Sequence, residues 1–261
     1  MKIDGKAIAE DMLRSLALQV EELKNRGVTP TLAVVMIGDN PANLAYIKQK
    51  QKAAERIGAR LILNHESRIM NHEIQQIIDS YNKDPKIHGV IVQRPVPEGI
   101  GEYHVTSEKD VDGFESHSPF DVPVAMAVWK CIESTGQKPK KFVVIGRGET
   151  AGAPIARYLE NKQCATSIIH SKTPGPQEIM KHADCIISCV GKERVVIPEA
   201  ITPGVIVIGV GIWRDTEGKL RGDYNEEEIE NIASYYTPTP GGVGPVNVAC
   251  LMQNLVAAST K

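Results

Sequence analysis

The chain has 261 residues, of which 42% are hydrophobic and 24% are charged, and its net charge at pH 7 is −2. A chain of this length can bury a full core and is expected to form two domains. The near-neutral charge gives no broad attraction to nucleic acid, and no apolar run reaches the length of a membrane span, so we expect neither kind of partner.

The cysteines and the N-terminus favour a cytoplasmic protein. Five cysteines, an odd number without a C-x-x-C pair, are typical of reduced core thiols and argue against a metal site. They are Cys131, Cys164, Cys185, Cys189 and Cys250. The chain opens directly into a helical pattern without the apolar core of a signal peptide.

The first third of the chain alternates helical and strand patterns. The spacing predicts helices over residues 7–25, 41–57 and 73–81, and strands over residues 31–37, 61–63 and 89–92. This alternation favours a parallel sheet with crossover helices. The prolines within residues 93–99 exclude a central strand, so we expect a loop at the C-terminal end of a strand, where α/β proteins hold ligands.

The rest of the chain predicts a second sheet. A polar loop at 109–114 precedes a helix at 122–133, and strands follow at 142–145, 165–170, 185–190, 205–210 and 235–236. Residues 237–245 are too rich in glycine and proline for any element, and a last helix at 246–258 could return to the first domain. We therefore predict an α/β protein of two three-layer domains with a cleft between them, the second a Rossmann-like parallel sheet. The domains are residues 1–120 with the C-terminal helix at 246–261, and residues 121–245.

A glycine cluster follows the strand at 142–145. Gly146, Gly148 and Gly152 precede a helical pattern, and such a loop lets a pyrophosphate approach the backbone and the helix N-terminus closely. The spacing is one residue longer than the usual dinucleotide fingerprint, so an ordinary glycine turn stays an alternative.

The residues after the next strand favour NADP over NAD. The chain lacks an acidic residue there to bind the ribose 2′-hydroxyl of NAD. It offers His170-Ser171-Lys172-Thr173 instead, with Arg147 in the glycine loop, and these donors and cations suit a 2′-phosphate.

One face of the second helix carries Asn43, Tyr46 and Lys50, which are spaced i, i+3 and i+7. A partly buried lysine beside an aromatic ring has a lowered pKa, which suits proton transfer at neutral pH; an exposed surface lysine is the alternative. Gln93 and Asp112, in the two polar loops, could supply its amide partner and a carboxylate, although each also suits an ordinary loop.

Several motifs together carry a family resemblance. They are Tyr46-x-x-x-Lys50, Gly89 to Gln93 with Pro95-Val-Pro97, Lys109 to Phe114, Gly146-Arg-Gly148, His170 to Thr173, Val190-Gly-Lys192 and Pro240 to Pro245. In this order they resemble the bifunctional methylenetetrahydrofolate dehydrogenase/methenyltetrahydrofolate cyclohydrolase of the FolD type, over nearly the whole chain. The resemblance implies NADP-dependent oxidation of 5,10-methylenetetrahydrofolate, then hydrolysis to 10-formyltetrahydrofolate, by a cytoplasmic homodimer.

The resemblance also implies residue roles. In the folate-binding catalytic domain at 1–120, Tyr46 would stack on the folate, Lys50 would do acid–base work, Gln93 would tune that lysine, and Asp112 would hold the pterin. The Gly241-Gly242 loop would bind substrate beside the cofactor. The residues expected to bind NADP are Gly146, Arg147, Gly148, Ser171, Ile212 and Asn247.

The chain departs from the family pattern at several positions. Asn43 replaces a serine, Arg94 a leucine, Gly148 a serine, Gly209 an aspartate and Asn247 a threonine, and Phe120 to Val124 lacks the usual Pro-Cys-Thr-Pro. Three alternatives therefore stay open: a dehydrogenase without hydrolase activity, a shikimate-dehydrogenase-like enzyme, and an NADP-binding sensor without catalysis.

Overall fold

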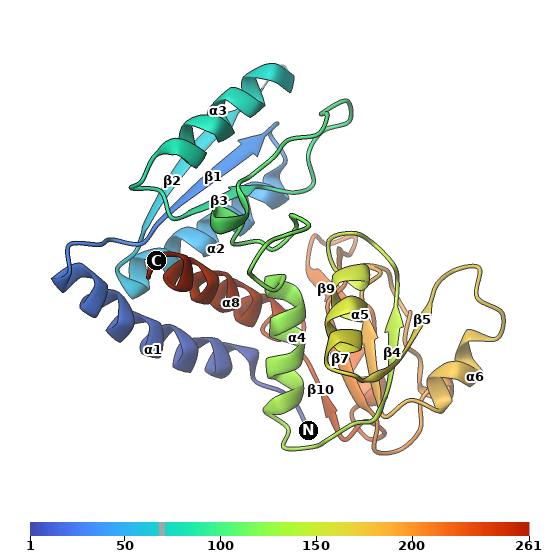
Figure 1. Cartoon of the computed structure of the whole chain (residues 1–261). Helices are drawn as coiled ribbons and strands as arrows, with labels where there is room; N and C mark the ends of the chain where they lie inside the picture. The colour runs from blue at the N-terminus through green and yellow to red at the C-terminus, as the bar shows by residue number, and fades with distance from the viewer. Residues whose placement is uncertain (68–70, 261) are drawn as a thin grey trace. The chain divides into compact units, whose positions relative to one another are not determined.

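The computed structural model describes residues 1–67 and 71–260, and the chain forms two compact units, each with its own parallel sheet (Figure 1). The three-stranded unit comprises Glu10–Pro123 and Val248–Lys261, and the five-stranded unit comprises Met1–Ala9 and Val124–Asn247. The first residues join the five-stranded unit because Ile3 N donates to Tyr236 O at 2.8 Å and Tyr236 N donates to Met1 O at 2.9 Å.

The three-stranded unit contains β1 (Thr31–Ile37), β2 (Arg60–Glu66) and β3 (Gly89–Val92), all parallel in the order β2-β1-β3. Its helices are α1 (Gly5–Asn25), which begins in the other unit, α2 (Pro41–Ile57), α3 (Asn71–Lys83), the 3-10 turn η1 (Ser107–Lys109) and most of α8 (Val243–Ala258).

Strand β1 is buried along its whole length, and its two faces meet different helices. Leu32, Val34 and Met36 pack with apolar residues of α1, α2 and α8. Ala33, Val35 and Ile37 pack with α3. The unit therefore has the predicted three layers, with the sheet between α3 and the other helices.

The five-stranded unit contains β4 (Lys141–Ile145), β5 (Ala165–Ile169), β6 (Cys185–Ser188), β7 (Ile206–Gly209) and β10 (Tyr235–Tyr236). The strands are parallel in the order β10-β7-β6-β4-β5. From β4 the chain passes outward to β5 and then returns to β6 on the other side of β4. Such a reversal is the point at which open α/β sheets bind ligands, outside the carboxyl ends of the strands. The predicted Rossmann-like sheet is confirmed.

The remaining elements of the five-stranded unit are short. They are α4 (Pro123–Glu133), α5 (Gly152–Asn161), α6 (Pro176–Lys181), the 3-10 turn η2 (Pro198–Ala200), the antiparallel hairpin β8 (Ile212–Arg214) with β9 (Leu220–Gly222), and α7 (Glu226–Ile229).

One prediction about this part of the chain is wrong: residues 237–245 do contain regular structure, because α8 begins at Val243. Gly244 and Pro245 lie in its first turn, where backbone amides have no partner within the helix, so a proline is tolerated. None of the five cysteines, all of which lie in the described part of the chain, forms a disulfide, and Cys131, Cys185 and Cys250 are buried. Within the described residues, the structure contains no helix with the length and apolar character needed to cross a bilayer.

Candidate active site

Lys50 and Gln93 are brought together by the layers of the three-stranded unit. Lys50 lies on α2, and Gln93 follows β3, held to β1 by a bond from Gln93 N to Val35 O of 2.8 Å. The Lys50 amine donates to Gln93 Oε1 at 2.9 Å. The Gln93 side chain is only 7% exposed, and its Nε2 donates to Arg94 O at 2.8 Å, so the amide has a fixed orientation.

Burial lowers the pKa of Lys50, and the nearby Asp112 carboxylate opposes this by favouring the charged amine. A lysine in this state can exchange a proton nearer neutral pH than an exposed lysine can. The predicted association of Lys50 with an amide and a carboxylate is therefore present in the structure.

Asn43 and Tyr46 lie on the same helix as Lys50. Asn43 is 1% exposed, and its Nδ2 donates to Pro95 O at 3.1 Å, so it fastens α2 to the loop after β3. Tyr46 is partly buried, one turn of helix from Lys50.

Asp112 lines a cavity of about 530 Å³ beside β3, in the three-stranded unit. The cavity wall also includes Arg94, Tyr103, Phe114 and Glu115. The Arg94 guanidinium lies over the Phe114 ring at 4.5 Å, and its charge opposes the rise in the pKa of Tyr103 that burial causes. Arg94 thus acts on two aromatic residues in the wall of the cavity that Asp112 lines.

The glycine loop of the five-stranded unit lies at the switch point between β4 and β6. Gly146 has φ of +104°, and a Cβ on it would lie 3.1 Å from Cys189 O, in the loop after β6. A Cβ on Gly152 would lie 2.3 Å from Gly146 O, so only glycine lets α5 begin this close to the loop. Gly148 has open space around it, so this position does not require glycine. The backbone cradle fits a pyrophosphate at the N-terminus of α5.

Arg147 and Ser171 lie at the same edge of the sheet. Strands β4 and β5 are neighbours in which Ile145 pairs with Ile169, and Arg147 and Ser171 each follow two residues later. Both residues are exposed. A guanidinium and a hydroxyl at this edge suit an added phosphate on a nucleotide ribose.

The loop after β6 is fixed by Asp223, a residue that the sequence analysis did not single out. Asp223 is fully buried and accepts hydrogen bonds from Ser188 Oγ at 2.6 Å, Val190 N at 2.9 Å and Lys192 N at 2.9 Å. Ile212 lies against the same loop, because a Cβ on Gly191 would be 2.9 Å from Ile212 O. No local sequence pattern predicts this role of Asp223, because its hydrogen-bond partners lie 31 to 35 residues earlier in the chain.

The Gly241-Gly242 segment immediately precedes α8. Gly241 has φ of +109°, and a Cβ on Gly242 would lie 2.6 Å from Pro238 O. Gly5 approaches the same segment so closely that a Cβ on it would overlap Gly242 O. Asn247 follows on α8 and is partly buried. Among the residues described, no three histidine, cysteine or acidic side chains are grouped to hold a metal ion.

Comparison with known proteins relates both units to one family. Residues 3–112 match the catalytic domain of tetrahydrofolate dehydrogenase/cyclohydrolase, and residues 123–261 match the NAD(P)-binding domain of the same family. The bifunctional FolD protein of Bacillus pumilus is 38% identical, over 99% of this chain and 97% of its own.

Solved structures agree with this relationship. The bifunctional dehydrogenase/cyclohydrolase of Campylobacter jejuni superposes with a TM-score of 0.95 at 33% identity, over 100% of this chain and 98% of its own. The Trypanosoma brucei enzyme, solved with NADP and an inhibitor, gives a TM-score of 0.94 at 28% identity, over 100% of this chain and 97% of its own. The chain therefore belongs to the tetrahydrofolate dehydrogenase/cyclohydrolase family.

Proposed function

We propose that this protein oxidises 5,10-methylenetetrahydrofolate to 5,10-methenyltetrahydrofolate with NADP, and hydrolyses that product to 10-formyltetrahydrofolate. Family membership over both units and relatives that match along nearly their full length support the two activities. The observation that carries the hydrolase half is the Lys50–Gln93 hydrogen bond, with the Asp112 charge acting on the same lysine.

Lys50 is the proposed acid–base group for hydrolysis. Water that adds to the methenyl carbon must lose a proton. As the bond from that carbon to the pteridine nitrogen then breaks, the nitrogen gains a proton, and the new hydroxyl group loses its own proton to solvent to become the formyl oxygen. A lysine whose pKa is lowered by burial can accept the proton from water and deliver one to the nitrogen. Gln93 holds the amine in place, because its own amide is fixed by the bond to Arg94 O.

Asp112 and Tyr46 are the proposed substrate-binding residues of this unit. A carboxylate accepts hydrogen bonds from neighbouring N–H groups, as the amino and ring N–H groups of a pterin present. Asp112 lines the cavity beside β3, and Tyr46 offers an aromatic ring on the α2 face that carries Lys50. Gly241 and Gly242, before α8, are also proposed to contact the substrate.

The five-stranded unit is proposed to bind NADP, which when bound accepts the hydride. The Gly146–Gly148 cradle would hold the pyrophosphate, and Arg147 with Ser171 would hold the 2′-phosphate. The Ile212 backbone, next to the Gly191 loop, and Asn247 are proposed to contact the nicotinamide end. Hydride transfer needs alignment of two carbons rather than a protein nucleophile, so these residues act by positioning.

The two activities can be tested separately. Purified protein with 5,10-methylenetetrahydrofolate and NADP should form reduced cofactor, and protein with 5,10-methenyltetrahydrofolate alone should accelerate its hydrolysis above the spontaneous rate. Reduction without accelerated hydrolysis would identify a dehydrogenase only. NADP binding without either reaction would identify a sensor.

We also propose that the enzyme is a homodimer acting in the cytoplasm on its small-molecule folate, without a nucleic-acid or membrane partner. Light scattering of the purified protein tests the dimer directly, because it should give twice the 28.5 kDa mass of one chain. A monomer mass at micromolar concentration would exclude it.

A further inference from the structure

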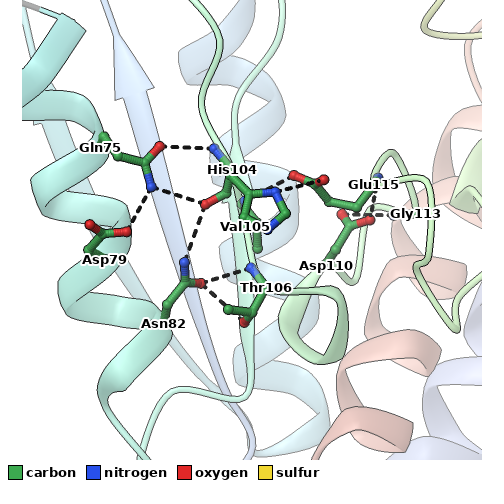
Figure 2. Close-up of polar contacts among 9 residues, drawn as sticks. All are labelled: Gln75, Asp79, Asn82, His104, Val105, Thr106, Asp110, Gly113 and Glu115. Atoms are coloured by element: carbon green, nitrogen blue, oxygen red, sulfur yellow. Dashed lines mark hydrogen bonds and ion pairs between the residues drawn. The ribbon is translucent and has the colours of Figure 1, made fainter.

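The turn that carries Asp112 is shaped by a second carboxylate, Asp110, which is only 4% exposed (Figure 2). Asp110 Oδ1 accepts from Gly113 N at 3.1 Å, and its Oδ2 accepts from Glu115 N at 2.8 Å. Both amides belong to residues that follow Asp112 in the chain, so the Asp110 carboxylate closes a turn that has Asp112 within it. Burial raises the pKa of Asp110, and the hydrogen bond from the Glu115 amide opposes this rise.

The Glu115 side chain extends from this turn to a neighbouring segment, residues 104–106. One carboxylate oxygen accepts from Val105 N at 3.0 Å, and the other lies 3.0 Å from His104 Nδ1. The side chain is 22% exposed, so solvent competes with these bonds only in part. Hydrogen bonds to a carboxylate are stronger than those between neutral groups.

Segment 104–106 is itself anchored on α3. Gln75 Oε1 accepts from His104 N at 2.9 Å, and its Nε2 donates to His104 O at 3.3 Å. Asn82 Oδ1 accepts from Thr106 N at 3.1 Å, and its Nδ2 also donates to His104 O at 3.3 Å. Figure 2 shows this chain of contacts running from α3 through segment 104–106 to Glu115 and Asp110. Glu115 therefore binds a backbone segment, residues 104–106, that side chains of α3 hold in place.

We propose that Glu115 is a positioning residue for Asp112: it ties the Asp112 turn to the α3-anchored segment, so that the Asp112 carboxylate is held toward the cavity that both residues line. This inference rests on the proposed role of Asp112 in binding the folate. Lys109 Nζ donates to Tyr81 O of α3 at 2.8 Å and so ties the N-terminal side of the turn to the same helix. Without Glu115 the C-terminal side of the turn, residues 113–115, loses its bonds to segment 104–106, and the substrate must then order that side. Glu115 makes no hydrogen bond to Lys50 or Gln93 among those found in the described chain, so the chemistry at saturating folate is retained.

The test is steady-state kinetics with 5,10-methylenetetrahydrofolate and NADP. Glu115→Ala should raise KM for the folate about tenfold or more, the loss expected for hydrogen bonds to a charged group, while kcat stays within about threefold and KM for NADP is unchanged. Glu115→Gln retains one acceptor oxygen and should restore part of the loss. Glu108→Gln, at an exposed carboxylate nearby, is the matched control and should match the wild type.

A double-mutant cycle separates positioning from general loosening of the fold. If Glu115 acts through Asp112, Glu115→Ala should add less than about twofold to KM in an Asp112→Asn background. Additive effects, a folate KM equal to that of Glu108→Gln, or an equal rise in both KM values would overturn the inference. If Glu115→Ala does not fold, Glu115→Gln is measured in the same cycle and decides.

The same assay keeps the two proposals apart. Wild-type turnover with an unchanged KM in the Glu115 variants refutes only the positioning role. Absence of wild-type turnover refutes the proposed function, and the positioning role with it.

Discussion

Replacing Lys50 with methionine should abolish most of the hydrolysis while leaving the protein folded. Methionine keeps an unbranched apolar stem of similar length, so the packing on α2 is retained while the amine bonded to Gln93 Oε1 at 2.9 Å is removed. A positioned acid–base group contributes about 10²- to 10⁴-fold to a rate. The hydrolysis barrier should therefore rise by about 3 to 5 kcal/mol.

Hydride transfer should fall by no more than about tenfold in Lys50→Met, because it depends on alignment of two ligands rather than on proton transfer by this amine. The assay follows loss of 5,10-methenyltetrahydrofolate and, separately, NADP reduction. Lys48→Met is the matched control, since Lys48 is an exposed lysine of the same helix. Hydrolysis by Lys50→Met within about tenfold of wild type, or an equal loss in Lys48→Met, would refute the acid–base role.

Three further changes test other parts of the account. Gln93→Glu places a negative charge beside Lys50 and should raise its pKa, so the pH–rate limb for hydrolysis that depends on neutral Lys50 should move to higher pH; an unmoved limb would mean that another group controls it. Arg147→Ala should raise KM for NADP by about 10- to 100-fold and change KM for NAD much less, because a charged hydrogen bond to phosphate is lost; equal changes would contradict the 2′-phosphate assignment. Asp223→Asn replaces one oxygen by an amide donor facing the Ser188–Lys192 loop, and should lower the free energy of unfolding in urea by about 1 to 3 kcal/mol and raise KM for NADP. Unfolding and KM equal to wild type would show that the loop does not depend on Asp223.

Local patterns in the sequence were sufficient to predict the main helices and strands, and to predict which polar residues share one face of α2. The burial of β1 on both sides follows from an unbroken apolar run, and the shared face of Asn43 and Lys50 follows from helical spacing. The parallel direction of the strands follows from the alternation of strands and helices, whereas the order of the strands within each sheet does not follow from it. These features depend on residues close together in the chain.

The features that the sequence did not predict depend on contacts made from irregular loops or between distant parts of the chain, which leave no periodic pattern in the sequence. Glu115 reaches His104 and Val105 from an irregular loop, and Asp223 reaches a loop more than 30 residues earlier. The start of α8 was misplaced because Gly244 and Pro245 argue against helix everywhere except in a first turn, and the sequence does not say where that turn falls. The motif Asp110-Val-Asp112-Gly113 predicts a functional carboxylate only at Asp112, although the Asp110 carboxylate is the one that closes the turn by accepting hydrogen bonds from backbone amides.

The most direct measurement is a single incubation of the protein with 5,10-methylenetetrahydrofolate and NADP, in which reduced cofactor, methenyl product and 10-formyl product are followed together. We expect 10-formyltetrahydrofolate to form in step with reduced cofactor, faster than spontaneous hydrolysis allows, and Lys50→Met to make the methenyl product accumulate instead. If the wild-type protein accumulates methenyl product in the same amount as reduced cofactor, Lys50, Gln93 and Asp112 do not form a hydrolytic site.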